Sequence, residues 1–193
     1  MSKWSKLYEK EIKEMDVKSY IKEKLRTKDT IIKLINKYAI SSKIMEVGSG
    51  TGILSLKLAT MGNNVVALDS DADMIALSKK YFLKEFDCPN IKYVNKDIRE
   101  YNEKEMFDVI YSIGILEHYS DDEIVELLNK QLLLADYVIF GIPTKYFDEK
   151  KKMYGNERYL KIRYWKNLIK RSRGVLIEES HYHYLKWYQR VLK

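Results

Sequence analysis

Between residues 43 and 143, strand-like and helix-like stretches alternate, and this alternation restricts the fold more than any other feature of the chain. Five stretches are short and rich in Val, Ile and Leu, as buried strands are: residues 43–48, 64–69, 91–97, 107–114 and 136–143. Three intervening stretches have apolar residues at helical spacing: residues 53–62, 72–86 and 121–134. This order predicts βαβ units, and therefore a mostly parallel sheet with helices on both faces.

The flanking segments extend this α/β pattern. Residues 5–39 predict two or three helices, with a break near residues 26–29 and Asp29 as a cap of the last helix. Residues 174–193 predict one or two strands, and residues 156–172 predict a basic amphipathic helix. The inward-facing residues of that helix are expected to be Leu160, Tyr164, Trp165, Leu168 and Ile169. The predicted fold is one α/β domain with a doubly wound sheet of seven or six strands.

Basic charge is concentrated near the C-terminal end of the chain. The formal net charge is +7, but residues 145–193 carry 14 Lys and Arg against 5 Asp and Glu, or +9, so the remainder carries −2. Such a segment can attract an anionic substrate or a nucleic acid by long-range electrostatics. A solvated Lys and Arg face of a helix has the same composition, and we favour that interpretation.

Other bulk features favour a cytoplasmic protein. Cys88 is the only cysteine, so no disulfide can form within the chain and a cysteine zinc site is not expected. No apolar run approaches the roughly 20 residues that span a bilayer. Residues 1–15 lack the apolar segment of a secretory signal. We therefore expect a protein of the reducing cytoplasm that does not associate with membranes.

The first predicted strand ends in a glycine-rich turn, Gly48-Ser49-Gly50-Thr51-Gly52. In doubly wound sheets the ligand binds beyond the carboxyl ends of the strands. Glycines at this place allow a sharp bend and a close approach of the ligand to the backbone. Dinucleotide-binding turns have the spacing G-x-G-x-x-G, but Ile53 stands where the last glycine would be. The spacing therefore disfavours a dinucleotide oxidoreductase.

Other motifs follow the turn in a set order. Glu46 lies two residues before the first glycine, Asp69 ends the second strand, and Asp97 ends the third. The fourth strand leads into the triplet Leu116-Glu117-His118 and then into a helix. With these motifs, residues 43–143 closely resemble the class I S-adenosylmethionine-dependent methyltransferases. The remainder of the chain resembles that family only in its architecture.

The resemblance implies a binding site for S-adenosylmethionine, with S-adenosylhomocysteine as the product. The glycine turn would cradle the amino-acid end of the cofactor, and Glu46 would hold its ammonium group, often through water. Asp69 would accept hydrogen bonds from both ribose hydroxyls. Asp97 would accept one from the adenine amino group, and the N–H of Ile98 would meet a ring nitrogen. The implied cofactor contacts are Glu46, Gly48, Ser49, Gly50, Gly52, Asp69, Ser70 (beside the adenine), Asp97, Ile98 and Ser112.

His118 is the candidate general base. It follows the fourth strand at the ligand edge of the sheet, and histidine ionises near neutral pH. A base helps when the methyl acceptor is a hydroxyl or a protonated amine. The alternative is a histidine that packs under the loop or bonds a backbone carbonyl. Some relatives that methylate quinone precursors bind a divalent metal near this triplet, but Glu117 and His118 alone make a weak ligand set, and we predict no metal.

The loop after the fifth strand borders the acceptor site in this family. It contains Tyr146, Tyr154 and Arg158, which suit an anionic or aromatic acceptor through stacking and charge-assisted hydrogen bonds. His181 and His183 are two residues apart and would share one face of a strand. We expect an ordinary surface position for both.

These expectations combine into a single-domain methyltransferase. Residues 1–42 would be a helical lid, residues 43–143 the cofactor-binding core, and residues 144–193 the acceptor-side loop, basic helix and last strands. The expected reaction transfers a methyl group to an O or N nucleophile of a small molecule by in-line displacement. The alternatives are an RNA-modifying methyltransferase that uses the basic segment and a non-catalytic S-adenosylmethionine-binding protein. The protein is expected to be a monomer or a homodimer.

Overall fold

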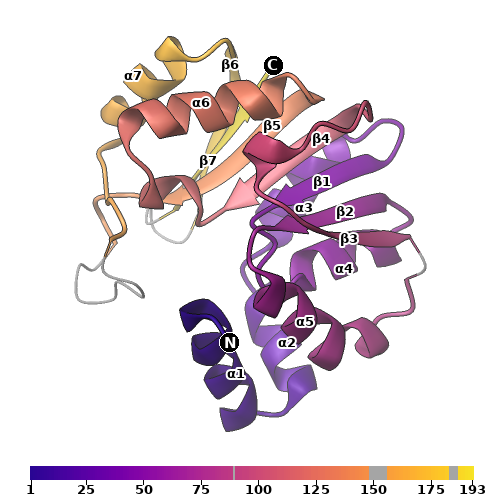
Figure 1. The fold of residues 1–193 in the computed structure, drawn as a ribbon. Helices are drawn as coiled ribbons and strands as arrows, with labels where there is room; N and C mark the ends of the chain where they lie inside the picture. The colour runs from indigo at the N-terminus through magenta and orange to yellow at the C-terminus, as the bar shows by residue number, and fades with distance from the viewer. Residues whose placement is uncertain (89, 148–155, 183–186) are drawn as a thin grey trace. The chain divides into compact units, whose positions relative to one another are not determined.

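The structure is a computed structural model that describes residues 1–88, 90–147, 156–182 and 187–193 (Figure 1). The chain divides into two compact units, an N-terminal unit, Met1–Glu103, and a C-terminal unit, Lys104–Lys193. Together the described parts contain seven strands, three in the first unit and four in the second. The α/β prediction is confirmed in its seven-stranded version.

The N-terminal unit contains three parallel strands in the order β3-β2-β1: β1 Lys43–Val47, β2 Asn64–Asp69 and β3 Ile91–Asn95. The strands are in register, so that Val47 lies opposite Leu68 and Asp69 lies opposite Asn95. Their carboxyl ends therefore form one edge. Helices α4, Ile53–Thr60, and α5, Ala72–Tyr81, connect the strands, and 3-10 turns cover Leu83–Glu85 and Ile98–Glu100.

Three helices precede the first strand: α1 Lys3–Glu14, α2 Val17–Leu25 and α3 Asp29–Tyr38. Helix α1 lies against α5, where the backbone N–H of Ser2 donates to Asp73 and the Tyr81 hydroxyl donates to Glu9 at 2.8 Å. The expectation that Asp29 caps the third helix is wrong. Lys28 is the N-cap and makes no side-chain cap bond, while Asp29 lies in the first turn, where its charge suits the helix dipole.

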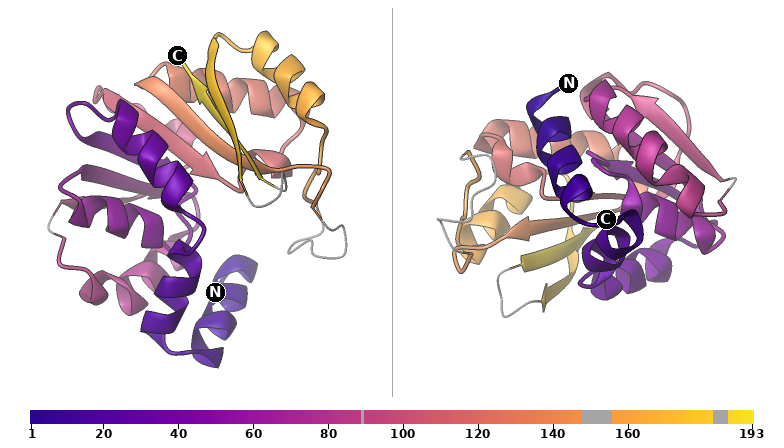
Figure 2. Two further views of the ribbon diagram at one scale, coloured as in Figure 1. Left: turned by 180° about the vertical axis from the view of Figure 1, so that it is seen from behind. Right: turned by 90° about the horizontal axis from the view of Figure 1, so that it is seen from below.

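The C-terminal unit has four strands in the order β4-β5-β7-β6: β4 Phe107–Ile113, β5 Ala135–Pro143, β6 Leu176–Tyr182 and β7 Trp187–Leu192. β4 and β5 are parallel, whereas β7 runs antiparallel to both β5 and β6. The last segment therefore forms two strands. A 3-10 turn at Leu116–His118 precedes helix α6, Asp121–Leu132, which packs beside α7, Ile162–Arg171 (Figures 1 and 2).

Helix α7 is shorter than predicted and is turned differently. It begins at Ile162, so Leu160 lies in the segment before it. Trp165, Leu168 and Ile169 are buried as expected, and the Trp165 ring lies 6.4 Å from that of Phe140. Tyr164 is 40% exposed, contrary to expectation, because its hydroxyl reaches Asp121 at the start of α6.

Some basic residues of the C-terminal segment form ion pairs within their own unit. Arg190 is fully buried on β7, with its guanidinium 3.3 Å from the Glu179 carboxylate. Burial lowers the pKa of Arg190 to about 9, against the opposing charge of Glu179. Lys166 also reaches Glu179, at 3.1 Å. Several basic residues of this segment therefore stabilise the fold itself.

Candidate active site

The glycine turn after β1 has a backbone that few other residues could adopt. Gly48, Gly50 and Gly52 have φ angles of 68°, 53° and 68°, in the left-handed region. The N–H groups of Gly48 and Ser49 both donate to the carbonyl of Leu68, at 2.9 and 3.0 Å. The turn after β1 is thus tied directly to the end of β2.

Asp69 clamps two turns together at that edge. One carboxylate oxygen accepts from the N–H of Gly50 at 2.8 Å, and the other accepts from the N–H of Asp71 at 2.9 Å. The side chain is buried, and burial raises the pKa of Asp69, while these two hydrogen bonds oppose the rise. Each oxygen retains a further lone pair, so the clamp is compatible with a bidentate contact to two hydroxyls.

Packing requires a glycine at position 52, which the sequence alone did not reveal. A Cβ atom at this position would lie 2.5 Å from the Ser78 hydroxyl oxygen on α5. A Cβ atom at Gly50 would meet nothing closer than the end of Met74, at 3.9 Å. Gly52 therefore allows α4 and α5 to approach each other, and its contact with a cofactor remains a prediction.

Glu46 is buried at the end of β1 and accepts a hydrogen bond from the Ser55 hydroxyl on α4. Lys28 lies within electrostatic reach: burial lowers the pKa of its ammonium group, and the charge of Glu46 acts in the opposite direction. The Ser49 hydroxyl is buried and has no hydrogen-bond partner among the residues that the structure describes. A buried hydroxyl without a partner is costly, so it fits a turn that is completed by a polar ligand.

The predicted adenine end lies where β3 leads into the 3-10 turn Ile98–Glu100. Asp97 caps this turn by accepting from the N–H of Arg99, whose guanidinium also binds the same carboxylate at 2.6 Å. The hydrogen bond from the Arg99 side chain holds the pKa of Asp97 below its ordinary value. Ile98 is buried and Ser70 is exposed directly after β2. The predicted adenine contacts remain untested.

The C-terminal unit holds a second group of predicted residues. Ser112, on β4, is buried, and its hydroxyl has no partner in the described part of the chain. His118 lies in the 3-10 turn that precedes α6. Its Nδ1 atom lies 2.8 Å from the side-chain oxygen of Asn156, a residue 38 positions further along the chain.

Glu117 is a buried carboxyl beside His118. Its side chain is only 3% exposed, and one of its oxygens has no hydrogen-bond partner within the described ranges. Burial raises the pKa of Glu117 to about 8, and the charge of Glu157, also buried, contributes to the rise. Glu117 is therefore mostly a neutral carboxylic acid near pH 7.

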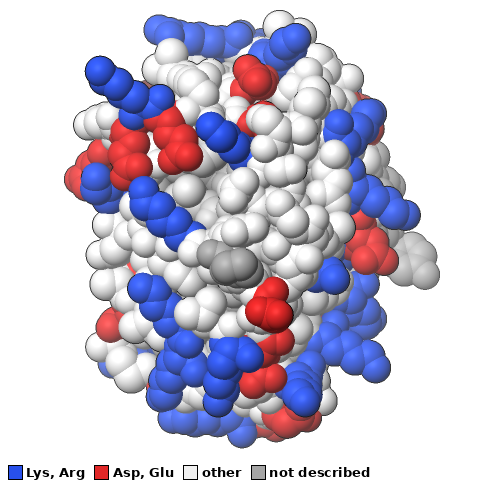
Figure 3. Space-filling view, turned by 90° about the vertical axis from the view of Figure 1, so that its right-hand side faces the viewer, with Lys and Arg blue, Asp and Glu red and all other residues white. Residues whose placement is uncertain are grey.

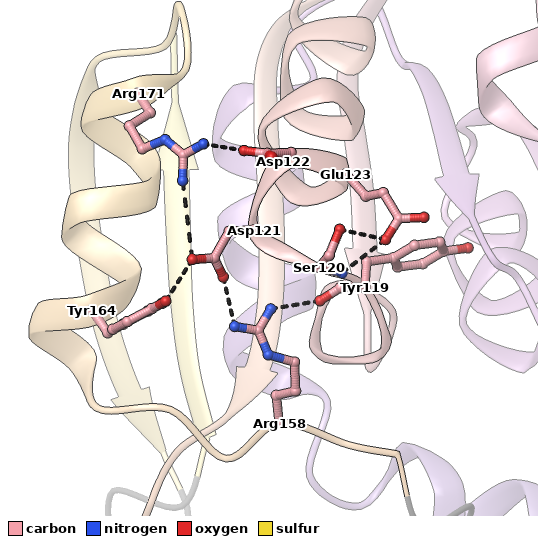
Figure 4. Close-up of polar contacts among 8 residues, drawn as sticks. All are labelled: Tyr119, Ser120, Asp121, Asp122, Glu123, Arg158, Tyr164 and Arg171. Atoms are coloured by element: carbon pink, nitrogen blue, oxygen red, sulfur yellow. Dashed lines mark hydrogen bonds and ion pairs between the residues drawn. The ribbon is translucent and has the colours of Figure 1, made fainter.

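Arg158 already has two protein partners. Its guanidinium donates to the Tyr119 carbonyl at 2.6 Å and to the Asp121 carboxylate at 2.5 Å. Figure 4 shows Arg158, Tyr164 and Arg171 converging on the acidic first turn of α6. Any contact of Arg158 with an acceptor would have to share these bonds. Of the other predicted acceptor contacts, Tyr146 is 51% exposed, and Tyr154 lies outside the described residues, as does His183.

The surface and the side-chain clusters add three observations. In the face seen in Figure 3, basic and acidic side chains are interspersed among uncharged ones. No group of three or more His, Cys, Asp or Glu suited to a metal ion occurs among the described residues. Within the same residues, every helix is too short or too polar to cross a membrane.

Comparison with known proteins finds a family match for part of the chain. Residues 44–132 match a methyltransferase domain family. The chain is 23% identical over 168 residues to the ubiquinone biosynthesis O-methyltransferase of Rickettsia akari, which covers 75% of this chain and 66% of the relative. It is 33% identical over 96 residues to malonyl-[acyl-carrier protein] O-methyltransferase 1 of Ilyobacter polytropus, which covers 49% and 34%. The chain thus spans about one third to two thirds of these relatives' lengths.

Solved structures show the same fold. A magnesium protoporphyrin IX methyltransferase from Synechocystis, with bound S-adenosylmethionine, matches with a TM-score of 0.67 and 16% identity over 85% of this chain and 75% of that one. An S-adenosylmethionine-dependent methyltransferase from Clostridium acetobutylicum matches with a TM-score of 0.69 and 14% identity over 99% and 97%. The fold is therefore that of the Rossmann-like methyltransferases. Residues 44–132 thus match a methyltransferase domain family, and the fold of the chain is similar to that of solved S-adenosylmethionine-dependent methyltransferases.

Sequence reasoning missed several residues that contact the predicted ones or interact with them electrostatically. Ser55 and Lys28 accompany Glu46, and Asn156 accompanies His118. Ser55 lies nine residues after Glu46, on a helix that the sequence predicted, and could have been found by asking which polar side chain faces the buried carboxylate. Lys28 and Asn156 carry no such local signal, because each comes from a distant segment.

Proposed function

We propose that this protein is an S-adenosylmethionine-dependent methyltransferase that methylates an oxygen or nitrogen nucleophile of a small molecule. One observation carries the proposal. The glycine turn at 48–52 is tied to the end of β2 and clamped by Asp69, and it presents a buried, unpartnered Ser49 hydroxyl next to an acidic strand end at Glu46. We call this set, Glu46, Gly48–Gly52 and Asp69, the glycine-turn site.

The residues of the glycine-turn site, together with Lys28, Asp97 and Ile98 of the same unit, fit the chemistry of the cofactor. The amino-acid end of S-adenosylmethionine is a zwitterion, and Glu46 and Lys28 offer the two opposite charges. Asp69 has lone pairs for both ribose hydroxyls. Asp97 and the N–H of Ile98 would hold the adenine. Charge-assisted hydrogen bonds of this kind are stronger than neutral ones, so the charged residues are expected to supply most of the specificity.

When bound, the cofactor supplies an activated methyl group on a sulfonium, and the leaving group is neutral. The protein therefore has mainly to position the acceptor, which can supply on the order of 7–11 kcal/mol of the barrier. His118 is proposed to take the proton from an acceptor hydroxyl or amine. General-base assistance of this kind is typically worth about 10²–10⁴ in rate.

The acceptor class is supported by the relatives and by the charge distribution. The curated relatives named above are O-methyltransferases, one in ubiquinone biosynthesis and one for malonyl-[acyl-carrier protein]. The basic residues that would serve a nucleic acid are in part committed elsewhere: Arg158 and Arg171 pair with Asp121 and Asp122, and Lys166 pairs with Glu179. We therefore favour a small-molecule hydroxyl over RNA as the acceptor, and a cytoplasmic location stays a prediction.

The test is turnover. Purified protein is incubated with S-adenosylmethionine and separate sets of phenols, carboxylates, amines and bulk tRNA, and S-adenosylhomocysteine is measured by mass spectrometry. Multiple turnovers with a phenol, carboxylate or amine would support the proposal. Multiple turnovers with tRNA, together with salt-sensitive tRNA binding, would replace it with the RNA-modifying alternative. Tight cofactor binding without turnover in any set would favour the non-catalytic alternative.

A further inference from the structure

We propose that Asn156 is a positioning residue that fixes the tautomer of His118 and so makes Nε2 the proton-accepting atom. The inference rests on the proposed function, since it assigns a helper to the base named there. Its starting point is the 2.8 Å contact between the His118 Nδ1 atom and the Asn156 side-chain oxygen. We call the residues around this contact the His118 cluster: Glu117, His118, Asp121 and 156–158.

The contact determines where the imidazole carries its hydrogen. An amide oxygen accepts hydrogen bonds and cannot donate them. With this oxygen facing Nδ1, the neutral ring must place its hydrogen on Nδ1 and its lone pair on Nε2. The tautomer of a histidine is generally set by the hydrogen bond that its other nitrogen makes. A general base at Nε2 requires this tautomer, and the opposite one would present an N–H to the acceptor.

The segment that carries Asn156 is itself bonded to the segment that carries His118. Both Asn156 and Arg158, on either side of Glu157, bind to the segment 117–121. The N–H of Arg158 donates to the Glu117 carbonyl at 2.9 Å, and the Arg158 guanidinium binds the Tyr119 carbonyl and the Asp121 carboxylate. Glu157, between them, is buried. These bonds hold the backbone two residues after Asn156, and Figure 4 shows the two contacts of the Arg158 guanidinium.

The arrangement also explains why a second ordered segment is needed. His118 lies in a 3-10 turn of only three residues, Leu116–His118, whose backbone does not itself fix the rotation of the imidazole ring. A hydrogen bond from a docked segment restricts that rotation as well as the tautomer. Positioning of this kind acts on the chemical step and leaves cofactor binding unchanged, which separates it from a role in the glycine-turn site.

The tautomer can be read directly by NMR. Long-range ¹H–¹⁵N correlation spectra of the full chain, recorded about two pH units above the ordinary histidine pKa, distinguish the two neutral tautomers. The chain has three histidines, and the signals that disappear in His118→Gln identify His118. We expect the Nδ1–H form in the wild type and a shift toward Nε2–H in Asn156→Ala. Asn64→Ala, which removes an exposed asparagine from the start of β2, should leave the spectrum unchanged.

A His118 that is already in the Nε2–H form in the wild type would overturn the proposal, as would a spectrum that Asn156→Ala does not change. This reading needs no acceptor, so it decides the proposal even if no acceptor is turned over. With a working acceptor, Asn156→Ala should lower kcat by on the order of tenfold with an unchanged Kd for S-adenosylmethionine. An unchanged kcat would also overturn the proposal, while the methyltransferase activity itself would stand.

Discussion

The glycine-turn site and the His118 cluster are built in different ways. In the glycine-turn site, strand ends in register bring together residues 46–52 and 69, and backbone N–H groups make most of the bonds. In the His118 cluster, side chains and backbone of two segments nearly 40 residues apart meet. The first depends on glycine conformations and one carboxylate, and the second depends on ion pairs and hydrogen bonds from a loop. Cofactor binding and the proton transfer should therefore respond to separate mutations.

The largest expected effect is on turnover. His118→Ala should lower kcat with the true acceptor by about 10²–10⁴, because the proton would lose its acceptor. The Kd for S-adenosylmethionine, measured by isothermal titration calorimetry, should stay within about twofold, because no bond of the glycine-turn site is removed. Unchanged turnover would mean that His118 has only a packing role. The His118 cluster would then have no catalytic function to contrast with cofactor binding at the glycine-turn site.

The converse change is Asp69→Ala. It removes the clamp on Gly50 and Asp71 as well as the predicted ribose contact, so the Kd for S-adenosylmethionine should rise by about 100-fold, equivalent to about 2.7 kcal/mol. The fold should remain intact by circular dichroism. Asp87→Ala, at an exposed aspartate of the same unit, is the matched control. Near-normal affinity of Asp69→Ala would refute the assigned role.

The pH dependence of stability tests the description of Glu117 in the His118 cluster. Because the folded protein raises the pKa of Glu117 to about 8, the folded state keeps a proton that the unfolded state loses above its ordinary pKa near 4.5. This stabilising contribution is complete below pH 4.5 and is lost as the pH rises to about 8, with a slope of at most about 1.4 kcal/mol per pH unit.

Glu117→Gln should remove that slope, because glutamine does not titrate. Urea unfolding between pH 5 and pH 8 would measure it, and the variant should gain stability relative to the wild type as the pH rises. Parallel pH dependences for the two proteins would show that Glu117 is ionised in the folded state, against the burial described above.

The smallest effect is expected at Lys28. Lys28→Met keeps a side chain of similar length but removes the positive charge that interacts with Glu46, so the affinity for S-adenosylmethionine should fall about tenfold. Lys33→Met, at an exposed lysine of α3, should have no effect. An equal loss in both variants would mean that only the overall charge matters, and the specific pairing with the cofactor carboxylate would be wrong.

The difference between the two regions also explains what the sequence could predict. The βαβ alternation, the glycine turn and the carboxylates Asp69 and Asp97 are local patterns. The structure places Asp69 at the end of β2 as expected, whereas β3 ends at Asn95 and Asp97 caps the 3-10 turn that follows it. The partners of Arg158, Tyr164 and His118 could not be predicted, because they depend on which loop meets which helix. Helical periodicity alone predicted that Tyr164 would be buried. In the structure its side chain is exposed, and its hydroxyl bonds to Asp121.

Gly52 illustrates the same limit within the glycine-turn site. Its position in the motif predicted a cofactor contact, whereas the structure shows that a side chain there would collide with Ser78 of α5. A motif residue can thus be required for packing between helices as well as for a ligand. Only the three-dimensional neighbours of Gly52 distinguish the two requirements.

The central claim, that the glycine turn at 48–52 holds S-adenosylmethionine, is tested most directly by thermal unfolding with S-adenosylmethionine, S-adenosylhomocysteine and NAD in parallel. A ligand at 100 times its Kd adds about 2.7 kcal/mol, which for a domain of this size raises Tm by roughly 5–11 °C. Mass spectrometry of the denatured protein first establishes that no cofactor was carried through purification. A rise with both S-adenosyl compounds and none with NAD is the predicted result. No rise with either S-adenosyl compound, in protein shown to be free of cofactor, would contradict the account.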